Sequence, residues 1–283
     1  MSGHHQHRQR VKYTSPFASL ALSDVEAESL EQLSRMILRD YVAQYEAFQR
    51  QGGTANVDTR VWKPIKRRGD VCVFAQRKHH DDEQEVGFDN IRESVASLSE
   101  SGARQPSDLP VMLTVGSMAG TLDDLMYGLV CPTIEVMRIK TSYIIDQVND
   151  CVVLQTIASP TEDDPFQSVV IKWVQNQQSF LLRPAVNSRD FVYMERTGIA
   201  HTTSGERLGF QLLHSVHFPQ THELPSFIRG NISFCGIYRQ NEESNRVDMY
   251  LRAIVDPCGS AIRPMVILAA ADMFISVWKF LEC

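Results

Sequence analysis

Four histidines lie close together in the chain and are the first candidates for catalysis or metal binding: His201, His214, His217 and His222. Residues 207–218 are predicted to form a strand, on which side chains three positions apart point to opposite faces. His214 and His217 therefore do not converge on one metal ion. Ser215 diverges from His214 in the same way, and the sequence has no G-x-S-x-G motif of a nucleophile elbow. We expect neither a catalytic residue nor a metal site.

The six cysteines offer a second kind of chemistry, but they are scattered along the chain: Cys72, Cys131, Cys151, Cys235, Cys258 and Cys283. No C-x-x-C pair of the kind that binds zinc or exchanges disulfides occurs. The pattern indicates reduced, mostly buried thiols, which are typical of cytoplasmic proteins. The N-terminus lacks the apolar core of a signal peptide, so we expect a cytoplasmic protein, and we expect no cofactor.

The composition is that of an ordinary globular protein. Of 283 residues, 43% are hydrophobic and 22% are charged, which is enough to bury a core. The net charge of -6 opposes general nucleic-acid binding, because neutralising phosphates requires an excess of basic side chains. We expect a monomer without a nucleic-acid partner, which contacts membranes transiently and only through local patches.

The chain is predicted to contain a single folded domain, residues 23–283, preceded by a flexible tail. Residues 1–22 lack apolar periodicity, which predicts the tail. Residues 79–110 are polar and rich in Ser, Asp and Glu, which is typical of a surface insertion carrying at most one short helix, at residues 89–98.

Helices and strands follow from the spacing of apolar residues. Ser23 and Glu26 form the S-x-x-E pattern of a capping box and predict a helix that continues to about Phe48. Two short helices are predicted at residues 121–129 and from Pro132 onward. Strands are predicted at residues 61–68, 70–78, 111–118, 152–158, 167–175, 190–199, 207–218, 231–239 and 247–255.

The first of these strands carries the most basic cluster of the sequence: Lys63, Lys66, Arg67 and Arg68. Such a cluster is usually a solvated strand edge, since Lys and Arg protect exposed edges from pairing. A docking patch for anionic headgroups is the alternative interpretation.

The closing segment, residues 264–281, is predicted to be the helix around which the chain is organised. Its apolar residues recur at helical spacing, but Asp272, Ser276 and Lys279 interrupt it and it is too short to span a bilayer. A curved antiparallel sheet is the element that encloses one apolar helix over much of its circumference. We therefore predict an α+β fold in which a sheet of about nine strands wraps around a long C-terminal helix, with two short helices between the third and fourth strands.

Part of this pattern resembles a known family. Pro184, followed by RDFVYMER at residues 189–196, resembles the P-x-x-x-x-R-D-F-V-Y strand of START domains, the steroidogenic-acute-regulatory-protein-related lipid-transfer family. HSVHFP at residues 214–219, IRG at 228–230 and DPCG before IRP at 256–264 resemble three later segments of that family, in the same order. Two positions depart from it: Phe218 stands where the family has a histidine before proline, and Cys258 replaces a glycine.

The resemblance implies the helix-grip fold, in which a U-shaped sheet clasps the C-terminal helix above an apolar tunnel. It also implies a function: non-enzymatic binding of a single lipid, of the sterol, phospholipid or ceramide type, for intracellular transfer or sensing. Two alternatives stay open. One is a helix-grip enzyme, because related helix-grip proteins include enzymes, and the other is a lipid-regulated protein-interaction module.

Strand parity and the apolar face of the closing helix predict which residues line the tunnel, since alternate residues of a strand face opposite sides. For each apolar residue the alternative is core packing without ligand contact. The parity of residues 207–218 is poorly determined, because Leu213 is apolar too. The predicted lining is Phe191, Tyr193, Glu195, Phe210, Leu212, His214, Ile232, Phe234, Met249, Leu251, Ala253, Ile267, Ala270, Ala271, Phe274 and Trp278.

Glu195 places a carboxylate in this apolar wall, which is costly without a partner. Its carboxylate either binds a lipid headgroup or hydroxyl, or it pairs with an arginine such as Arg196, Arg207 or Arg229. A lid is predicted at residues 177–188, where a Phe-Leu-Leu triplet either touches a bilayer or plugs the tunnel.

Overall fold

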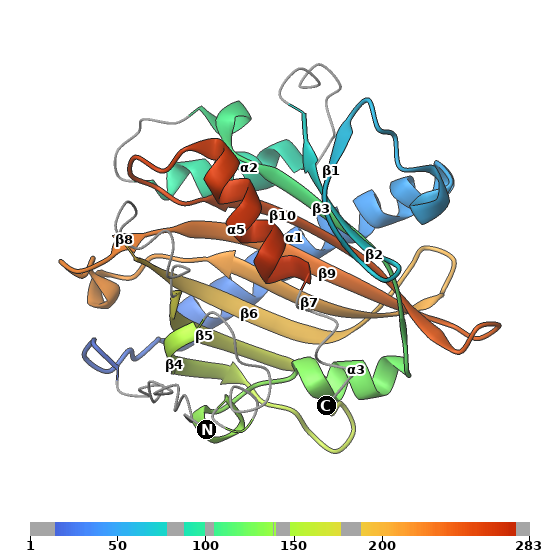
Figure 1. Cartoon of the computed structure of the whole chain (residues 1–283). Coiled ribbons are helices and arrows are strands. Elements are labelled where there is room, and N and C mark those ends of the chain that lie inside the picture. Colours follow the sequence, from blue (N-terminus) through green and yellow to red (C-terminus); the bar gives the residue numbers. More distant parts are fainter. Residues whose placement is uncertain are drawn as a thin grey trace, which may run out of the picture.

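The computed structural model describes residues 15–77, 88–99, 105–137, 139, 148–176 and 188–275, which form one large sheet with helices on both faces (Figure 1). The strand order is β1-β2-β3-β10-β9-β7-β6-β5-β4, antiparallel throughout, and the short β8 pairs with β6 in parallel. The strands are β1 (Trp62–Arg68), β2 (Val71–Gln76), β3 (Val111–Ala119), β4 (Val148–Ala158), β5 (Ser168–Asn176), β6 (Arg189–His201), β7 (Arg207–Ser215), β8 (Ile228–Arg229), β9 (Asn231–Asn241) and β10 (Arg246–Asp256).

The helices begin and end where local sequence signals place them. They are α1 (Asp24–Arg50), α2 (Phe88–Ser97), α3 (Leu122–Leu129) and α5 (Arg263–Ile275), with single 3-10 turns at η1 (Gly53–Asn56), η2 (Pro106–Asp108) and η3 (Pro219–Thr221). At the start of α1 the predicted capping box is present: Ser23 Oγ accepts a hydrogen bond from the backbone N–H of Glu26, whose carboxylate accepts one from the N–H of Ser23. After α1 the chain turns at Gly52, whose φ of +102° is a left-handed conformation that favours glycine.

The two faces of the sheet carry different helices. In Figure 1, α5 lies in front of the sheet and α1 lies behind it. We call the face under α5 the inner face and the opposite face the outer face. Along β10, Met249 and Leu251 belong to the apolar cluster under α5, whereas Tyr250 and Ile254 pack with α1 and α2 on the outer face.

The helix α5 covers only part of the inner face. It packs against β1, β2 and β3. Over β4, β5 and β6, the chain near Cys131 and Met137 packs instead, with Cys151, Val174 and Tyr193 beneath it. The inner face therefore has two neighbouring regions, one under α5 and one beside it.

The predicted α+β class, with an antiparallel sheet wrapped around a C-terminal helix, is confirmed. The sheet has ten strands where about nine were expected, because the two-residue β8 joins it. Two predicted features lie outside the described residues: the last turns of the closing helix with Trp278, and the lid apart from Ser188. Of the insertion predicted at residues 79–110, the structure describes residues 88–99 and 105–110.

The described end of the predicted tail packs on the sheet. Phe17 and Leu20 are buried beside β5 and β6, and the Phe17 ring meets the Trp173 ring edge-on at 6.0 Å between centroids. Phe17 and Leu20 therefore belong to the core, which the prediction of a flexible tail did not anticipate. Two isolated apolar side chains gave no periodicity, so the sequence pattern did not reveal their burial.

None of the helices in the described part of the chain combines the length and the apolar composition needed to cross a membrane.

Candidate functional site

Most of the predicted lining residues meet on the inner face under α5. The Phe234 ring of β9 stacks on the Phe274 ring of α5, with centroids 5.5 Å apart and planes inclined by 27°. Ile267 is partly exposed and packs against the same cluster. The other predicted residues buried there are Ile232, Met249, Leu251, Ala253, Ala270 and Ala271. Their contact with a lipid stays a prediction.

The three predicted residues of β7 lie on the wrong face. Phe210 and Leu212 belong to the outer-face cluster with α1 and α2, and His214 follows the same parity. Leu213, which pairs with Phe234 in β9 and with Glu195 in β6, is the residue of β7 that packs on the inner face. The prediction failed because β7 carries apolar side chains on both of its faces. Only the register in which β7 pairs with its neighbours decides which of these faces is the inner one.

His214 is the centre of a buried hydrogen-bonded network on the outer face. Its Nε2 lies 3.2 Å from Ser94 Oγ of α2, and its Nδ1 lies 3.0 Å from Ser233 Oγ of β9. The Tyr41 hydroxyl of α1 donates to the same Ser233 Oγ at 3.1 Å. Burial lowers the pKa of His214 to about 4, so the ring is neutral near neutral pH. This network joins both outer helices to the sheet and has no access to the inner face.

Phe191, Tyr193 and Glu195 lie on the inner face beside α5, as parity predicted. Phe191 packs with the clusters of both inner-face regions, and Tyr193 is buried beside Cys131 and Cys151. Burial, and secondly the Glu195 carboxylate, raise the pKa of Tyr193 well above its usual value, so the phenol stays protonated.

Glu195 forms a buried ion pair in this region. Lys172 of β5 places its Nζ 2.6 Å from Glu195 Oε1, and the two side chains are 2% and 7% exposed. Burial alone would lower the pKa of Lys172, but the carboxylate more than offsets it, and the pKa is raised. An ion pair in an apolar interior is costly to desolvate and gains little stability, so its presence here is a candidate functional feature.

The expected arginine partners of Glu195 have other partners. Arg196 donates to Ser34 Oγ, Arg207 pairs with Asp123, and Arg229 pairs with Asp190. The pairing prediction therefore named the wrong residues, since the partner is Lys172. The sequence did hold a signal, because Lys172 stands within the apolar run SVVIKWV of a strand buried on both faces.

Three further polar groups of the inner face are buried without a hydrogen-bond partner among the described residues. They are the hydroxyls of Thr114, Ser168 and Tyr238. Thr114 pairs across the sheet with Val73 and Leu251, which places it in the region under α5. Because buried hydroxyls are normally hydrogen-bonded, these groups indicate where a bound molecule would find donors.

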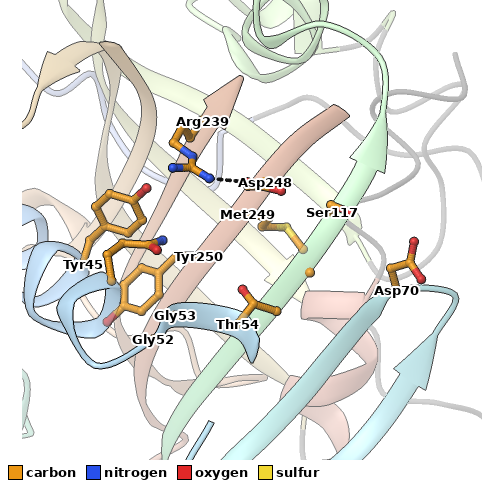
Figure 2. Close-up of a pocket in the computed structure, with 12 residues that line it drawn as sticks. Tyr45, Gly52, Gly53, Thr54, Asp70, Ser117, Arg239, Asp248, Met249 and Tyr250 are labelled. Carbon is orange, nitrogen blue, oxygen red and sulfur yellow. Dashed lines mark hydrogen bonds and ion pairs between the residues drawn. The ribbon is translucent and has the colours of Figure 1, made fainter. Parts of the chain in front are cut away.

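A separate small pocket opens where α1 ends, next to β3, β9 and β10 (Figure 2). Its volume is about 220 Å³, below the ~300 Å³ at which ordinary ligand sites begin. Its charged groups are already paired: Arg239 donates to Asp248 at 2.6 Å, and Arg246 binds Asp70 at 2.7 Å. We therefore place the candidate site on the inner face. Within the described ranges, His, Cys, Asp and Glu side chains form no group of three that would hold a metal ion.

Comparison with known proteins identifies the fold. No family model matches the sequence, and no curated protein is matched by sequence similarity. Among solved structures, human StAR-related lipid transfer protein 5 superposes with a TM-score of 0.52 at 13% identity, over 88% of this chain and 97% of its own. Human STARD10 superposes with a TM-score of 0.51 at 13% identity, over 84% of this chain and 78% of its own. The chain therefore has the START-type helix-grip fold that the sequence motifs predicted.

Proposed function

We propose that this protein binds a single lipid between the inner face of its sheet and α5, without catalysis, in order to transfer or sense that lipid. The observation that carries the proposal is the buried Lys172–Glu195 ion pair beside a largely apolar wall. An interior of this kind matches an amphipathic ligand, which has a long apolar body and one polar end. The shared fold with human StAR-related lipid transfer protein 5 supports the same function.

The apolar body of the lipid would lie under α5. There it would contact Phe234, Met249 and Leu251 of the sheet and Phe274 of the helix. Each buried CH2 group gains about 0.8 kcal/mol, which makes an acyl chain or a sterol a strong ligand for this wall. Because Phe234 and Phe274 stack directly on each other, a lipid enters only when α5 moves away from β9. Movements of this size occur in microseconds to milliseconds.

The polar end of the lipid would bind beside α5. Lys172 Nζ donates and the Glu195 carboxylate accepts, so that a hydroxyl or an amide finds both kinds of partner. The Ser168 hydroxyl, on the same strand and with the same parity as Lys172, adds a donor without a partner among the described residues. A sterol hydroxyl, a ceramide or a phospholipid headgroup suits this chemistry.

The test is capture of a fluorescent sterol, ceramide or phospholipid by the purified protein. Phe234→Glu places a carboxylate against Phe274 and is expected to abolish capture, whereas Phe234→Leu, the matched control, retains it. The far-ultraviolet circular dichroism spectrum of both variants identifies any loss of fold. If Phe234→Glu is folded and captures lipid as well as the unmodified protein, the ligand does not lie under α5.

Transfer and sensing need the same site and are separated by a second assay. A carrier moves labelled lipid between two populations of vesicles without a partner protein, whereas a sensor binds lipid without moving it. We further propose that the protein is a cytoplasmic monomer that contacts membranes only transiently.

A further inference from the structure

The small pocket at the end of α1 contains two buried hydrogen-bond donors that the fold leaves unused (Figure 2). Neither the hydroxyl of Tyr45 nor the Nε–H of Arg239 has a hydrogen-bond partner among the described residues. Tyr45 is only 3% exposed, and in Figure 2 its hydroxyl points toward the Arg239 guanidinium. Because buried donors are normally hydrogen-bonded, two unpaired donors in one pocket indicate a ligand that offers acceptor atoms.

The Tyr45 hydroxyl keeps its proton and is therefore available as a donor near neutral pH. Burial raises the pKa of Tyr45 to about 12, although the positive charge of Arg239 partly offsets this rise. The Gln49 amide lies near the hydroxyl without reaching hydrogen-bonding geometry. A ligand acceptor between Tyr45 and Arg239 would satisfy both donors.

The charges of the pocket favour a neutral ligand over an anion. Among the described residues that line it, Arg239 is the one basic side chain, and its terminal nitrogens bind Asp248 at 2.6 Å and Glu206 at 3.3 Å. Asp70, the second lining carboxylate, binds Arg246 at 2.7 Å. A phosphate or carboxylate would therefore lie beside two carboxylates and meet an arginine that is already neutralised.

The same wall also offers hydrogen-bond acceptors. A carboxylate accepts up to about four hydrogen bonds, so Asp248 and Asp70 keep capacity beyond their ion pairs. The Ser117 hydroxyl accepts a hydrogen bond from Arg246 Nε at 2.9 Å and still has its own proton to donate. A ligand hydroxyl both accepts and donates, so a molecule with several hydroxyls matches this mixture of groups.

The size and the aromatic wall of the pocket suit a small ring. Its volume of about 220 Å³ is the space of about seven water molecules at ~30 Å³ each, which is too little for a lipid. The rings of Tyr45 and Tyr250 line it and meet edge-on, with centroids 5.6 Å apart. The C–H groups of a saturated ring can pack on these aromatic faces. Gly52 and Gly53 line the pocket with backbone alone, which leaves this space open.

We propose that this pocket binds a free, neutral polyhydroxyl molecule of the size of one sugar or inositol ring. Its oxygens accept hydrogen bonds from Tyr45 and Arg239, and its hydroxyls donate to Asp70 and Asp248. The ring packs against Tyr250. Tyr45 and Tyr250 belong to the outer-face cluster, so this site is separate from the lipid site on the inner face and does not depend on it.

Saturation-transfer NMR with glucose, galactose, mannose and myo-inositol measures this binding directly. Thermal stabilisation is a poor readout here, because polyols stabilise most proteins by exclusion from their surface. At least one of the four compounds should bind saturably. Tyr45→Phe and Arg239→Lys should each weaken its binding about fivefold, the effect of losing one hydrogen bond. The matched controls Tyr127→Phe and Arg35→Lys remove the same groups outside the pocket and should bind like the unmodified protein.

A second pair of variants blocks the pocket without changing its hydrogen-bonding groups. Thr54 and Ala55 are exposed neighbours in η1, but only Thr54 lines the pocket. Thr54→Trp should abolish polyol binding, whereas Ala55→Trp should retain it. Without ligand, Tyr45→Phe should be as stable in urea as the unmodified protein, because the hydroxyl that it loses has no partner among the described residues. A marked loss of stability would show that this hydroxyl serves the fold and would contradict the proposal.

Several outcomes would overturn the proposed site. They are the absence of saturable binding of any of the four polyols, equal affinity in the pocket and control variants, and displacement of the polyol by lower concentrations of inorganic phosphate or acetate. Binding to vesicles that display glucosylceramide, without binding of the free compounds, would overturn the proposal of a free ligand. Thr54→Trp should capture lipid normally, so the polyol site and the lipid site succeed or fail independently.

Discussion

Acidification is expected to destabilise the protein through His214. Burial between α1, α2 and the sheet lowers its pKa from 6.5 to about 4, because the charged ring would lose its hydration. Above about pH 6.5 the ring is neutral in the folded and the unfolded chain. Between about pH 6.5 and about pH 4 the unfolded chain binds a proton that the folded chain does not bind, so the free energy of unfolding falls as the pH falls. The pKa shift corresponds to a decrease of about 3 kcal/mol in the free energy of unfolding, which is complete near pH 4.

Urea unfolding of the unmodified protein and of His214→Gln, across this pH range, measures the effect. Glutamine keeps hydrogen-bonding atoms for Ser94 and Ser233 but does not titrate. Carboxylates titrate in both proteins, so their contribution to the free energy of unfolding cancels when the two proteins are compared. The unmodified protein should lose about 3 kcal/mol more than the variant on going from neutral pH to about pH 4. Equal losses in the two proteins would refute the assignment of a depressed pKa to His214.

Two further predictions concern Lys172 and Cys258. Lys172→Met should lower the free energy of unfolding by about 3–5 kcal/mol, because it leaves the Glu195 carboxylate buried and unpaired. Adding Glu195→Leu should restore most of that loss. A double variant that is as unstable in urea as the single variant would contradict this. Cys258 has a φ of +49°, the left-handed conformation that costs a non-glycine residue about 1–2 kcal/mol. Cys258→Gly should therefore raise the melting temperature, while Cys258→Ala, which keeps the strain, should not.

Local signals in the sequence predicted the elements and much of the fold. The capping box of Ser23 and Glu26 placed the start of α1, and the alternation of polar and apolar residues placed Met249 and Leu251 on the inner face. Periodicity also predicted a sheet wrapped around the closing helix, and the motif around residues 189–196 pointed to the same helix-grip fold. Periodicity alone does not fix the strand order.

The predictions that failed concern contacts between segments that are distant in the sequence. Leu212 and Leu213 are both apolar, so only the pairing of β7 with β9 decides which of them faces α5. Lys172 and Glu195 meet because β5 and β6 pair in a particular register, which the sequence does not state. Phe17 is buried by strands that lie more than a hundred residues further along the chain. Burial of single residues by remote segments leaves no periodic pattern to detect.

Native mass spectrometry of the purified protein, followed by lipid extraction, tests the central claim most directly. We predict that the protein carries one lipid molecule per chain, released when the chain unfolds, and that folded Phe234→Glu carries none. A protein that is recovered without lipid, and that takes up no sterol, ceramide or phospholipid offered to it, would contradict the proposal.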